Sequence, residues 1–542
     1  MAYSNTLSET ANQAETAAPA RAQGAFARAM EPLSTIARNM FALDYRSLAL
    51  LRIAMGLCLL WVVYISACEM RAFYTDEGVL PRSAVFENAD QFIGFSLHFA
   101  NGSVPYIATL FGIQFVLAFM LVVGYRTRLA IIGSYILLLS MQDRQPVLLY
   151  GADGALRLGL FWMMFLPLAE RFSLDRLAGR ARADTSRCYL GVAGLAFILQ
   201  VCIIYTFGAL MKSGPTWHVD HTAVAYALAT DAYSRPLGHW LGQFHGFDRF
   251  LTVATLFFEL YGPALFILPL WSKWGRLLGI ALFAGLQIGF GLCMTMGHFG
   301  PVMIALTLVF LPAFFWERIA EPLGRKLAQK FHAIAAIAST PLGAPWRHWI
   351  ARERSHSILN FPLPPSRRIR AARITLDIVR DAAVLGLLAI TVLWNLGHLR
   401  DQPWRLTPAL TTLGRATGIS QMWDMFAPDP NTTDGWFVVA GTLHNGQTVD
   451  LMTGASPVSY DRPASVAGTF KSTLWMSYLS SFWTPGASSP DLFTTYLGKT
   501  WNEHHSGGER IDTIEFSAMV ETVTLEPDKP PARKELIWVQ AF

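Results

Sequence analysis

The sequence predicts an all-α polytopic membrane helical bundle of about nine transmembrane helices, followed by a small extracytoplasmic α+β domain at the C-terminal end. Apolar residues make up 53% of the chain and charged residues only 15%, and the mean hydropathy is +0.34. Several apolar runs reach the roughly 20 residues that a helix needs to cross a bilayer. After residue 400 the sequence becomes more polar and alternates as half-buried strands do.

Nine apolar segments are expected to span the membrane. They lie near 47–68, 105–123, 127–142, 152–169, 189–211, 250–270, 276–296, 299–316 and 380–397. The first eight form one transmembrane domain over 47–316, and 380–397 is the ninth span. Residues 1–46 contain no apolar signal-peptide core, so we expect a disordered cytoplasmic tail there.

Lysine and arginine concentrate in alternate loops, after the second, fourth, sixth and eighth spans. Cytoplasmic loops are enriched in these residues, so the N-terminus is expected in the cytoplasm and the C-terminal domain outside. The basic segment 317–379 is expected to lie along the cytoplasmic membrane face, against lipid headgroups. This pattern predicts an integral membrane protein that contacts membrane lipids and no nucleic acid.

Residues 398–542 are expected to form the outer α+β domain. Predicted strands cover 436–443, 447–453, 513–523 and 535–539, and a predicted amphipathic helix covers 472–483. Between the first two strands, Asn445-Gly446 is a signal for a type I′ hairpin turn.

The residue that points most directly to function is Lys212, which ends the apolar segment 189–211. An ammonium group at a membrane boundary costs free energy unless it reaches water, pairs with an anion or loses its proton. Lysine is also the residue type whose pKa falls readily on desolvation, which suits it to act as a base. The simpler alternative is an interfacial anchor whose side chain extends to water. Tyr205 lies about two helical turns earlier and therefore on the same face.

Other polar groups are expected near the same outer end of the bundle. Candidates for substrate or cofactor binding are Asp76, Arg82, Asp143, Arg144 and Asp153 from the outward side, Tyr205, Trp217 beyond the lysine, His298 at a turn, and Glu259 and Gln287 within spans. Polar groups inside spans either hydrogen-bond between helices or mark a functional path, and both alternatives stay open for Glu259 and Gln287.

Metal and thiol chemistry are not indicated. The five cysteines form no C-x-x-C pair, so neither a disulfide framework nor a zinc site is expected. His218-Val-Asp-His221 is a weak metal-binding spacing without a second pair of ligands, and we expect no metal.

Taken together, these segments resemble the HTTM family, the membrane module shared by vitamin K-dependent gamma-glutamyl carboxylase and many bacterial proteins. The matching motifs are Arg52-Ile-Ala-Met-Gly56, Phe73-Tyr-Thr-Asp-Glu-Gly-Val-Leu-Pro-Arg82, Gly151-Ala-Asp-Gly154, Phe165-Leu-Pro167, Ser173-Leu-Asp175, Phe258-Glu259, Phe299-Gly-Pro-Val-Met-Ile304 and Phe310-Leu-Pro312. The segment Trp423-Asp-Met-Phe-Ala-Pro428 is similar to bacterial members, so the resemblance implies a bacterial inner membrane.

The resemblance implies that Lys212, in a Lys-x-x-x-x-Trp setting with Trp217, is the base that deprotonates vitamin K hydroquinone or menaquinol. In the carboxylase the deprotonated quinol then reacts with oxygen to give a strongly basic epoxide-alkoxide, which abstracts a γ-proton from glutamate before carbon dioxide adds. The family's Asn-Asn-His cluster is replaced here by Asp143-Arg-Gln-Pro146, and Gln287 stands near a position that is often histidine in bacterial members.

The resemblance therefore implies quinol-dependent modification of an exported peptide or small acceptor, with carboxylation as one form of it. The alternative is a non-catalytic membrane protein that binds or helps to mature an exported partner. A transporter is less favoured, because the sequence contains no evident inverted repeat with paired broken helices.

Overall fold

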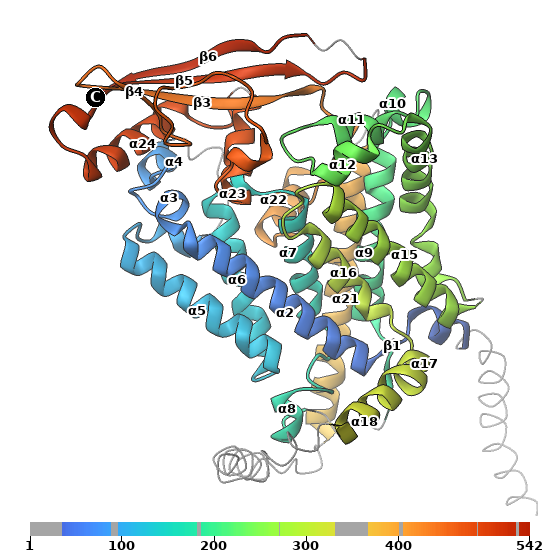
Figure 1. The fold of residues 1–542 in the computed structure, drawn as a ribbon. Helices are drawn as coiled ribbons and strands as arrows, with labels where there is room; N and C mark the ends of the chain where they lie inside the picture. The colour runs from blue at the N-terminus through green and yellow to red at the C-terminus, as the bar shows by residue number, and fades with distance from the viewer. Residues whose placement is uncertain are drawn as a thin grey trace, which may run out of the picture.

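A computed structural model describes residues 35–87, 96–181, 186–269, 271–330, 367–399, 405–484, 486–526 and 530–542. A bundle of helices forms most of the molecule, and a four-stranded sheet with its own helices lies across one end of it (Figure 1). The predicted combination of a mostly helical bundle and a small sheet region is confirmed. Most of the predicted N-terminal tail, 1–34, and the central part of the basic segment, 331–366, lie outside the described residues.

Five helical segments in the described part of the chain are long and apolar enough to cross a membrane. They are α2 (Tyr45–Cys68), α5 (Val104–Val123), α9 (Val192–Met211), Gly246–Ile267, and α15 (Ser272–Cys293). Gly246–Ile267 comprises most of α13 (His245–Tyr261) and all of α14 (Ala264–Ile267). Five of the predicted spans therefore coincide with such segments.

The structure does not confirm the predicted total of nine spans. The predicted span 127–142 corresponds to α6 (Thr127–Arg144), which carries charges at both ends, and the predicted span 152–169 corresponds to α7 (Gly151–Met163), which is only 13 residues long. The predicted span 299–316 falls on two helical segments, Phe299–Phe310 and Ala313–Arg325, that meet at 93° around Pro312. Proline at such a break removes a backbone donor and disfavours a straight helix.

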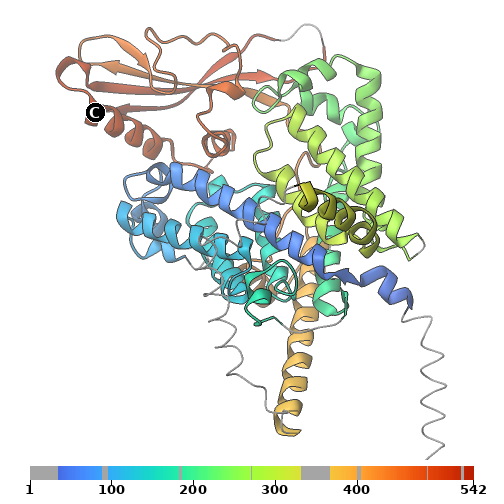
Figure 2. The ribbon, with the colours of Figure 1, turned by 60° about the horizontal axis from the view of Figure 1, so that its bottom comes forward.

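The predicted ninth span lies within a much longer helix, α21 (Arg367–Gly397, 31 residues). Figure 2 shows α21 running beyond the other helices at the end of the bundle opposite the sheet. At the same end the first described strand, β1 (Leu43–Asp44), pairs with β2 (Cys188–Tyr189). Regular structure therefore begins within the segment predicted as a tail.

Short helices connect the long ones. Those in the bundle are α3 (Met70–Tyr74), α4 (Arg82–Glu87), η2 (Leu97–Phe99), η3 (Pro146–Leu148), α8 (Leu174–Leu177), α10 (Pro215–His218), α11 (Ala223–Ala229), α12 (Pro236–Leu241), α16 (Phe299–Thr307), η4 (Leu308–Phe310), α17 (Ala313–Phe315), η5 (Trp316–Ala320) and α18 (Glu321–Lys330). Those after α21 are α22 (Pro408–Ala416), η7 (Ala467–Thr469), α23 (Thr473–Ser480), η8 (Ser481–Trp483), α24 (Pro490–His504) and η9 (Gly507–Glu509).

The sheet has the antiparallel order β4-β3-β5-β6. Its strands are β3 (Thr433–Leu443), β4 (Thr448–Asp450), β5 (Ile511–Thr522) and β6 (Arg533–Ala541). Both predicted strand pairs are confirmed, and the predicted helix 472–483 is α23 followed by η8. Helices α22 and α24 were not predicted from the sequence.

The predicted type I′ turn is wrong, although the hairpin that it joins is correct. A type I′ turn needs positive φ at both central residues. Here Gly446 has φ 81°, and Asn445 is not among the non-glycine residues with positive φ. The Gly446 amide donates to Leu443 O at 2.8 Å, and the Asn445 amide is taken by Gly508 O at 2.9 Å. The tertiary contact with the η9 segment thus favours a different backbone conformation at Asn445.

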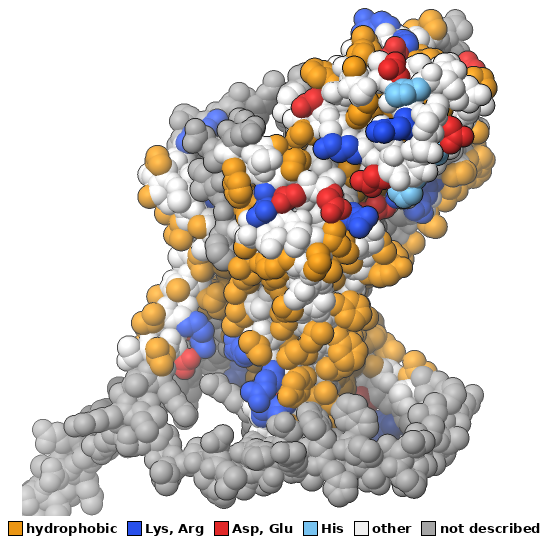
Figure 3. Space-filling view, turned by 90° about the vertical axis from the view of Figure 1, so that its left-hand side faces the viewer, with side chains coloured by type: hydrophobic (Ala, Val, Ile, Leu, Met, Phe, Trp, Pro, Cys, Tyr) orange, Lys and Arg blue, Asp and Glu red, His pale blue; other side chains and the backbone are white. Residues whose placement is uncertain are grey.

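One hydrophobic core runs from the bundle into the C-terminal region. The cluster that contains Leu51 and Leu156 also contains Trp475, Phe493 and Phe516. The chemical character of the surface changes from the sheet to the opposite end of the bundle. Apolar side chains form a waist between the sheet end, where both charges occur, and the opposite end, where basic side chains dominate (Figure 3). A band of this kind is typical of a protein surrounded by lipid.

Candidate functional site

A buried ion pair joins two helices near the sheet end of the bundle. Lys212 Nζ lies 2.6 Å from Glu259 Oε2, and the two side chains are only 5% and 11% exposed. The lysine follows the last residue of α9, and the glutamate lies in the last two turns of α13. Lys212 is therefore directed into the protein and does not extend to water as an interfacial anchor would.

The chain's local geometry turns the lysine inward. Helix α9 ends at Met211, and Lys212 leaves the helical conformation with ψ 65° ahead of Ser213-Gly214-Pro215. Its Nζ donates to Gly208 O, one turn back, at 3.2 Å. Because the ammonium is bonded to both a carbonyl and a carboxylate, its charge is compensated without contact with water.

Trp217, predicted from the lysine–tryptophan spacing, lies against the same group. Its ring centroid is 5.4 Å from Lys212 Nζ, within the range of a cation–π contact. Its indole N–H donates to Phe426 O at 2.9 Å. The His218 ring, one residue on, bonds to Lys212 O at 2.8 Å. Trp217 thus forms an aromatic wall beside the Lys212 ammonium, and the His218 ring holds the backbone carbonyl of the lysine.

The ion pair faces a cavity of about 70 Å³. The cavity is lined by Gly151, Ile204, Tyr205, Gly208, Lys212, Glu259, Gln287, Phe290, Phe299, Met303, Met422, Trp423, Asp424 and Met425. Tyr205, Glu259 and Gln287, all predicted from the sequence, are therefore brought together with Lys212. Most of the other walls are aromatic, methionine or aliphatic side chains, so the polar groups converge in an otherwise apolar space.

Gln287 offers an unused acceptor in this cavity. Its Nε2 lies 3.4 Å from the Tyr205 hydroxyl, a long hydrogen bond. Among the described residues its Oε1 has no hydrogen-bond partner, although the residue is only 2% exposed. A buried polar atom without a partner costs free energy, so this oxygen is available to a ligand or a water molecule.

The C-terminal segment 417–429, here called the closing segment, covers one side of the cavity. Arg157 of α7 donates to Gly418 O at 2.8 Å and to Ser420 O at 2.7 Å. At its other end Asp429 accepts from the Thr216 amide at 3.0 Å and also from the Thr216 hydroxyl. The segment is therefore held to the bundle at both ends.

A buried chain of hydrogen bonds fixes the middle of the closing segment. Gln421 Oε1 accepts from Gln200 Nε2 at 2.9 Å and from the Trp423 indole at 2.8 Å. The Trp162 indole donates to Gln200 Oε1 at 3.0 Å, and the Trp394 indole donates to Gln421 O at 3.0 Å. These bonds set Trp423 and the two residues after it against the cavity.

Two other predicted residues form a separate group nearby. His298 Nε2 lies 3.4 Å from Asp153 Oδ1, and His298 Nδ1 lies 2.8 Å from the Tyr150 hydroxyl. Asp153 also caps its own helix by accepting from the Tyr150 amide at 3.1 Å. Gly151 and Phe299 line the Lys212 cavity, whereas their neighbours Tyr150 and His298 line a smaller one of about 20 Å³. The two groups are thus back to back across the first turns of α7 and α16.

The remaining predicted residues lie away from the cavity. Asp76 and Arg82 pair at 2.8 Å within their loop, and the guanidinium lowers the pKa of Asp76. Arg144 is fully buried and donates to Leu80 O at 2.6 Å. Asp143 does not line the Lys212 cavity either.

The structure also places in the site residues that sequence reasoning missed. Trp423, Asp424 and Met425 line the cavity although they lie more than 200 residues after Lys212 in the chain. Their signals in the sequence are an aromatic and methionine cluster in an otherwise polar region and the motif 423–428, which the sequence showed only as a resemblance and not as part of a site. The part of the chain that the structure describes contains no group of three or more metal-ligating side chains.

No known family, curated protein or solved structure matches this chain. The function of this chain is therefore inferred from the geometry of the site and from the motifs in the sequence.

Proposed function

We propose that this chain is a membrane enzyme of the vitamin K-dependent carboxylase type, in which Lys212 and Glu259 act as a proton-accepting pair on a quinol. The observation that carries the proposal is the buried Lys212–Glu259 contact of 2.6 Å at the wall of an apolar cavity. Burial of an acid and a base side by side is costly, and it is favoured where proton transfer is needed.

The residues present suit a quinol in their chemistry. Phe290, Phe299 and Trp423 offer aromatic surfaces for a ring, and Gln287 Oε1 can accept a hydrogen bond from a hydroxyl. The Lys212–Glu259 pair can hold a proton at Nζ or at Oε2, which are within hydrogen-bond reach of each other. A quinol would supply the ionisable hydroxyl and the redox chemistry that side chains lack.

The cavity in its present form is too small for a quinol. Ligand pockets are commonly about 300–1,000 Å³, whereas this cavity is about 70 Å³. Residues 422–425 of the closing segment line the cavity and belong to neither a helix nor a strand, so their side chains can move more easily than those of the bundle. We infer that their displacement admits the ring and their return excludes water, which would otherwise compete for the transferred proton.

We further infer that the sheet end of the molecule is extracytoplasmic and that the N-terminus is cytoplasmic. The basic residues of the bundle, among them Arg126, Arg180 and Arg187, precede or follow spans at the end opposite the sheet. We count α6, α7, the bent pair of helices Phe299–Phe310 and Ala313–Arg325, and α21 as four further crossings. With the five long apolar segments they make nine, an odd number, which puts the two ends of the chain on opposite sides of the membrane. The site would then be open to a lipophilic cofactor from the bilayer and to an exported peptide or small acceptor.

The test is formation of quinone epoxide from reduced vitamin K or menaquinol under oxygen, with the protein in lipid nanodiscs and mass spectrometry as readout. Wild type is compared with Lys212→Met and with the double variant Lys212→Met/Glu259→Gln. Turnover is expected in the wild type and in neither variant, because both lack the base. The double variant leaves no unpaired buried charge, so its loss of activity is not explained by misfolding.

Lys471→Met is the matched control, because Lys471 is exposed and lies far along the chain in the C-terminal domain. It should retain wild-type turnover. Equal turnover in the wild type and the folded double variant would contradict the proposal, and so would no turnover in the wild type with either quinol.

The second candidate function is a non-catalytic protein that binds or helps to mature an exported partner. Its supporting observation is the outer edge of the sheet, where β6 exposes Leu536, Trp538 and Val539. An unpaired edge strand can receive an extended peptide. In this case Lys212 and Glu259 serve only to join α9 to α13, and the double variant retains partner binding.

A further inference from the structure

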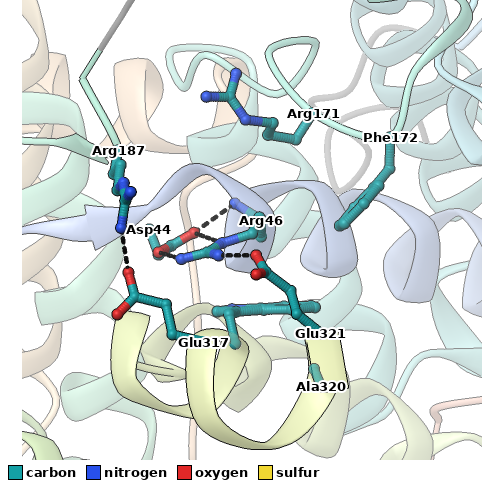
Figure 4. A pocket seen from close by; sticks show the side chains of 9 residues that line it. Asp44, Arg46, Arg171, Phe172, Arg187, Glu317, Ala320 and Glu321 are labelled. Carbon is teal, nitrogen blue, oxygen red and sulfur yellow. Dashed lines mark hydrogen bonds and ion pairs between the residues drawn. The ribbon is translucent and has the colours of Figure 1, made fainter. Parts of the chain in front are cut away.

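A large cavity near the end opposite the sheet is unrelated to the Lys212 site. It measures about 530 Å³ and is lined by Asp44, Arg46, Arg171, Phe172, Arg187, Trp316, Glu317, Ala320 and Glu321. These residues come from β1, the start of α2, the loops before α8 and β2, and the bent helix η5–α18 (Figure 4). Its volume is in the range of pockets that hold small molecules.

The floor of this pocket is rigid and electrically compensated. Arg46 is 13% exposed and bonds to Asp44 at 2.7 Å and to Glu321 at 2.5 Å. Its guanidinium also lies 5.8 Å from the ring centroid of Trp316, whose indole N–H donates to Ser47 Oγ at 2.8 Å. The guanidinium of Arg46 thus stabilises the fold and has few hydrogen-bond donors left for a ligand.

The upper part of the pocket contains a second arginine, Arg171, which differs from Arg46 because no carboxylate of the pocket holds its guanidinium. Arg171 Nη1 donates to the backbone carbonyl of Glu170 at 2.9 Å, and its guanidinium lies 6.0 Å from the ring centroid of Tyr45. Within the described part of the chain no ion pair joins Arg171 to a carboxylate. In Figure 4 its guanidinium stands above the Arg46 cluster, with no bond to the other side chains drawn. A half-buried guanidinium with free donors is well suited to a phosphate, which matches its planar donor geometry.

Opposite it, two carboxylates keep exposed oxygens. Glu317 pairs with Arg187 at 2.5 Å, but these side chains remain 42% and 72% exposed, and Glu321 is 51% exposed. Exposed ion pairs contribute little and exchange readily. The pocket's three arginines balance its three acids, so its charge fits a neutral ligand whose own positive and negative groups are separated.

The position of the pocket next to exposed apolar side chains indicates that its ligand also has an apolar part. The pocket is lined on one side by the bent helix η5–α18, which belongs to a segment that turns by 93° from the one before it (Figure 4). This helix exposes Ile319 and Leu323, and Phe172 at the pocket is 57% exposed. Such a helix is typical of one lying in the membrane interface.

We propose that this pocket binds the headgroup of a membrane phospholipid that carries both a phosphate and a primary ammonium, as phosphatidylethanolamine does. Arg171 takes the phosphate, and Glu317 with Glu321 takes the ammonium. The acyl chains extend past Phe172 into the bilayer. The bound lipid would hold the bent helix η5–α18 against the start of α2.

The test is native mass spectrometry of the purified full chain titrated separately with phosphatidylethanolamine, phosphatidylcholine and phosphatidylglycerol. Wild type is expected to prefer phosphatidylethanolamine, because the choline headgroup has no N–H donors and the glycerol headgroup has no cation. Arg171→Gln should weaken phosphatidylethanolamine binding about tenfold, the effect of one lost charge-assisted hydrogen bond. Glu317→Gln should remove the preference over phosphatidylcholine.

Arg318→Gln is the matched control, because Arg318 is exposed on the same helix and does not line the pocket. It should bind as the wild type does, and melting temperatures without added lipid check that each variant is folded. Unchanged binding in Arg171→Gln, or equal wild-type binding of the three lipids, would overturn the proposal. Displacement of the lipid by an equal concentration of soluble glycerophosphoethanolamine would show that the acyl chains contribute nothing, which would overturn their part in the proposal.

Discussion

Lys212 and Glu259 are 47 positions apart in the chain, yet they form the shortest contact between an acid and a base in the interior of the bundle that the structure describes. Their coupling is the first property to test, independently of any activity. Lys212→Met or Glu259→Gln alone should lower the free energy of unfolding by about 3–5 kcal/mol, because each leaves the other group without its partner.

The double variant should recover most of that loss, within about 1 kcal/mol of the wild type, because neither buried charge remains. The measurement is a double-mutant cycle of unfolding in detergent. Additive losses in the double variant would show that the two side chains do not depend on each other.

His98 gives a prediction on pH. It is 2% exposed in η2, and its ring Nδ1 lies 2.7 Å from Ser140 Oγ. Burial, with a smaller contribution from Arg144, lowers the pKa of His98 from 6.5 to about 4. The unfolded chain therefore binds the proton first as pH falls, so stability is complete above pH 6.5 and about 3 kcal/mol is lost as pH falls toward 4.

His98→Asn should remove this loss, which melting temperatures measured between pH 7 and 4 can show. Comparing the variant with the wild type cancels the contributions of all other titratable groups. An identical pH profile in both proteins would mean that His98 is charged in the folded state.

Several residues of the sequence motifs that suggested a function instead form hydrogen bonds with backbone groups. Arg52 is fully buried and donates to Leu121 O, Val122 O and Phe172 O. Asp175 accepts from the amides of Arg126 and Thr127 and from the Thr127 hydroxyl. These side chains satisfy carbonyls and amides at helix ends and loops, so their spacing reflects the fold and not the reaction.

At the scale of elements, the closing segment determines whether the site is accessible. It contributes the side chains that complete the cavity, and its ends are held by Arg157 and Asp429. The segment is neither helix nor strand over most of its length, so side-chain hydrogen bonds replace a backbone ladder. Loss of one end should therefore release it without unfolding the bundle.

Asp429→Ala tests this point. The Thr216 amide donates to Asp429 Oδ1, and the neighbouring Gly214 amide donates to Pro428 O at 3.0 Å. Hydrogen exchange at these amides and through the closing segment should rise about tenfold or more, corresponding to the 1–3 kcal/mol of a lost buried hydrogen bond. Asp461→Ala, in an exposed loop of the same domain, should leave them unchanged. Equal protection in the two variants would show that Asp429 does not hold the segment.

At the scale of the whole molecule, the orientation in the membrane can be read from native cysteines. Cys68 at the end of α2 and Cys188 in β2 are both exposed, and they lie toward opposite ends of the bundle. In intact cells an impermeant maleimide should label Cys68 and not Cys188, and both should react after permeabilisation. Peptide mass spectrometry identifies the labelled sites. The reverse pattern would place the sheet in the cytoplasm and remove the topological basis of the functional proposal.

The sequence by itself determined the membrane character, the strand pairs of the sheet, and five long apolar segments among the nine spans that it predicted. It also pointed to Lys212, Tyr205, Glu259 and Gln287. These follow from hydropathy, from the spacing of residues along helices and strands, and from the rarity of charge inside spans, all of which are local properties. Trp217 came from the resemblance alone.

Only the tertiary structure decided that Lys212 pairs with Glu259, that the closing segment completes the cavity, and that Asp76 and Arg144 belong elsewhere. It also changed the hairpin turn at Asn445, whose amide is taken by a distant carbonyl. These outcomes depend on contacts between residues far apart in the chain, and no pattern within a single segment specifies them.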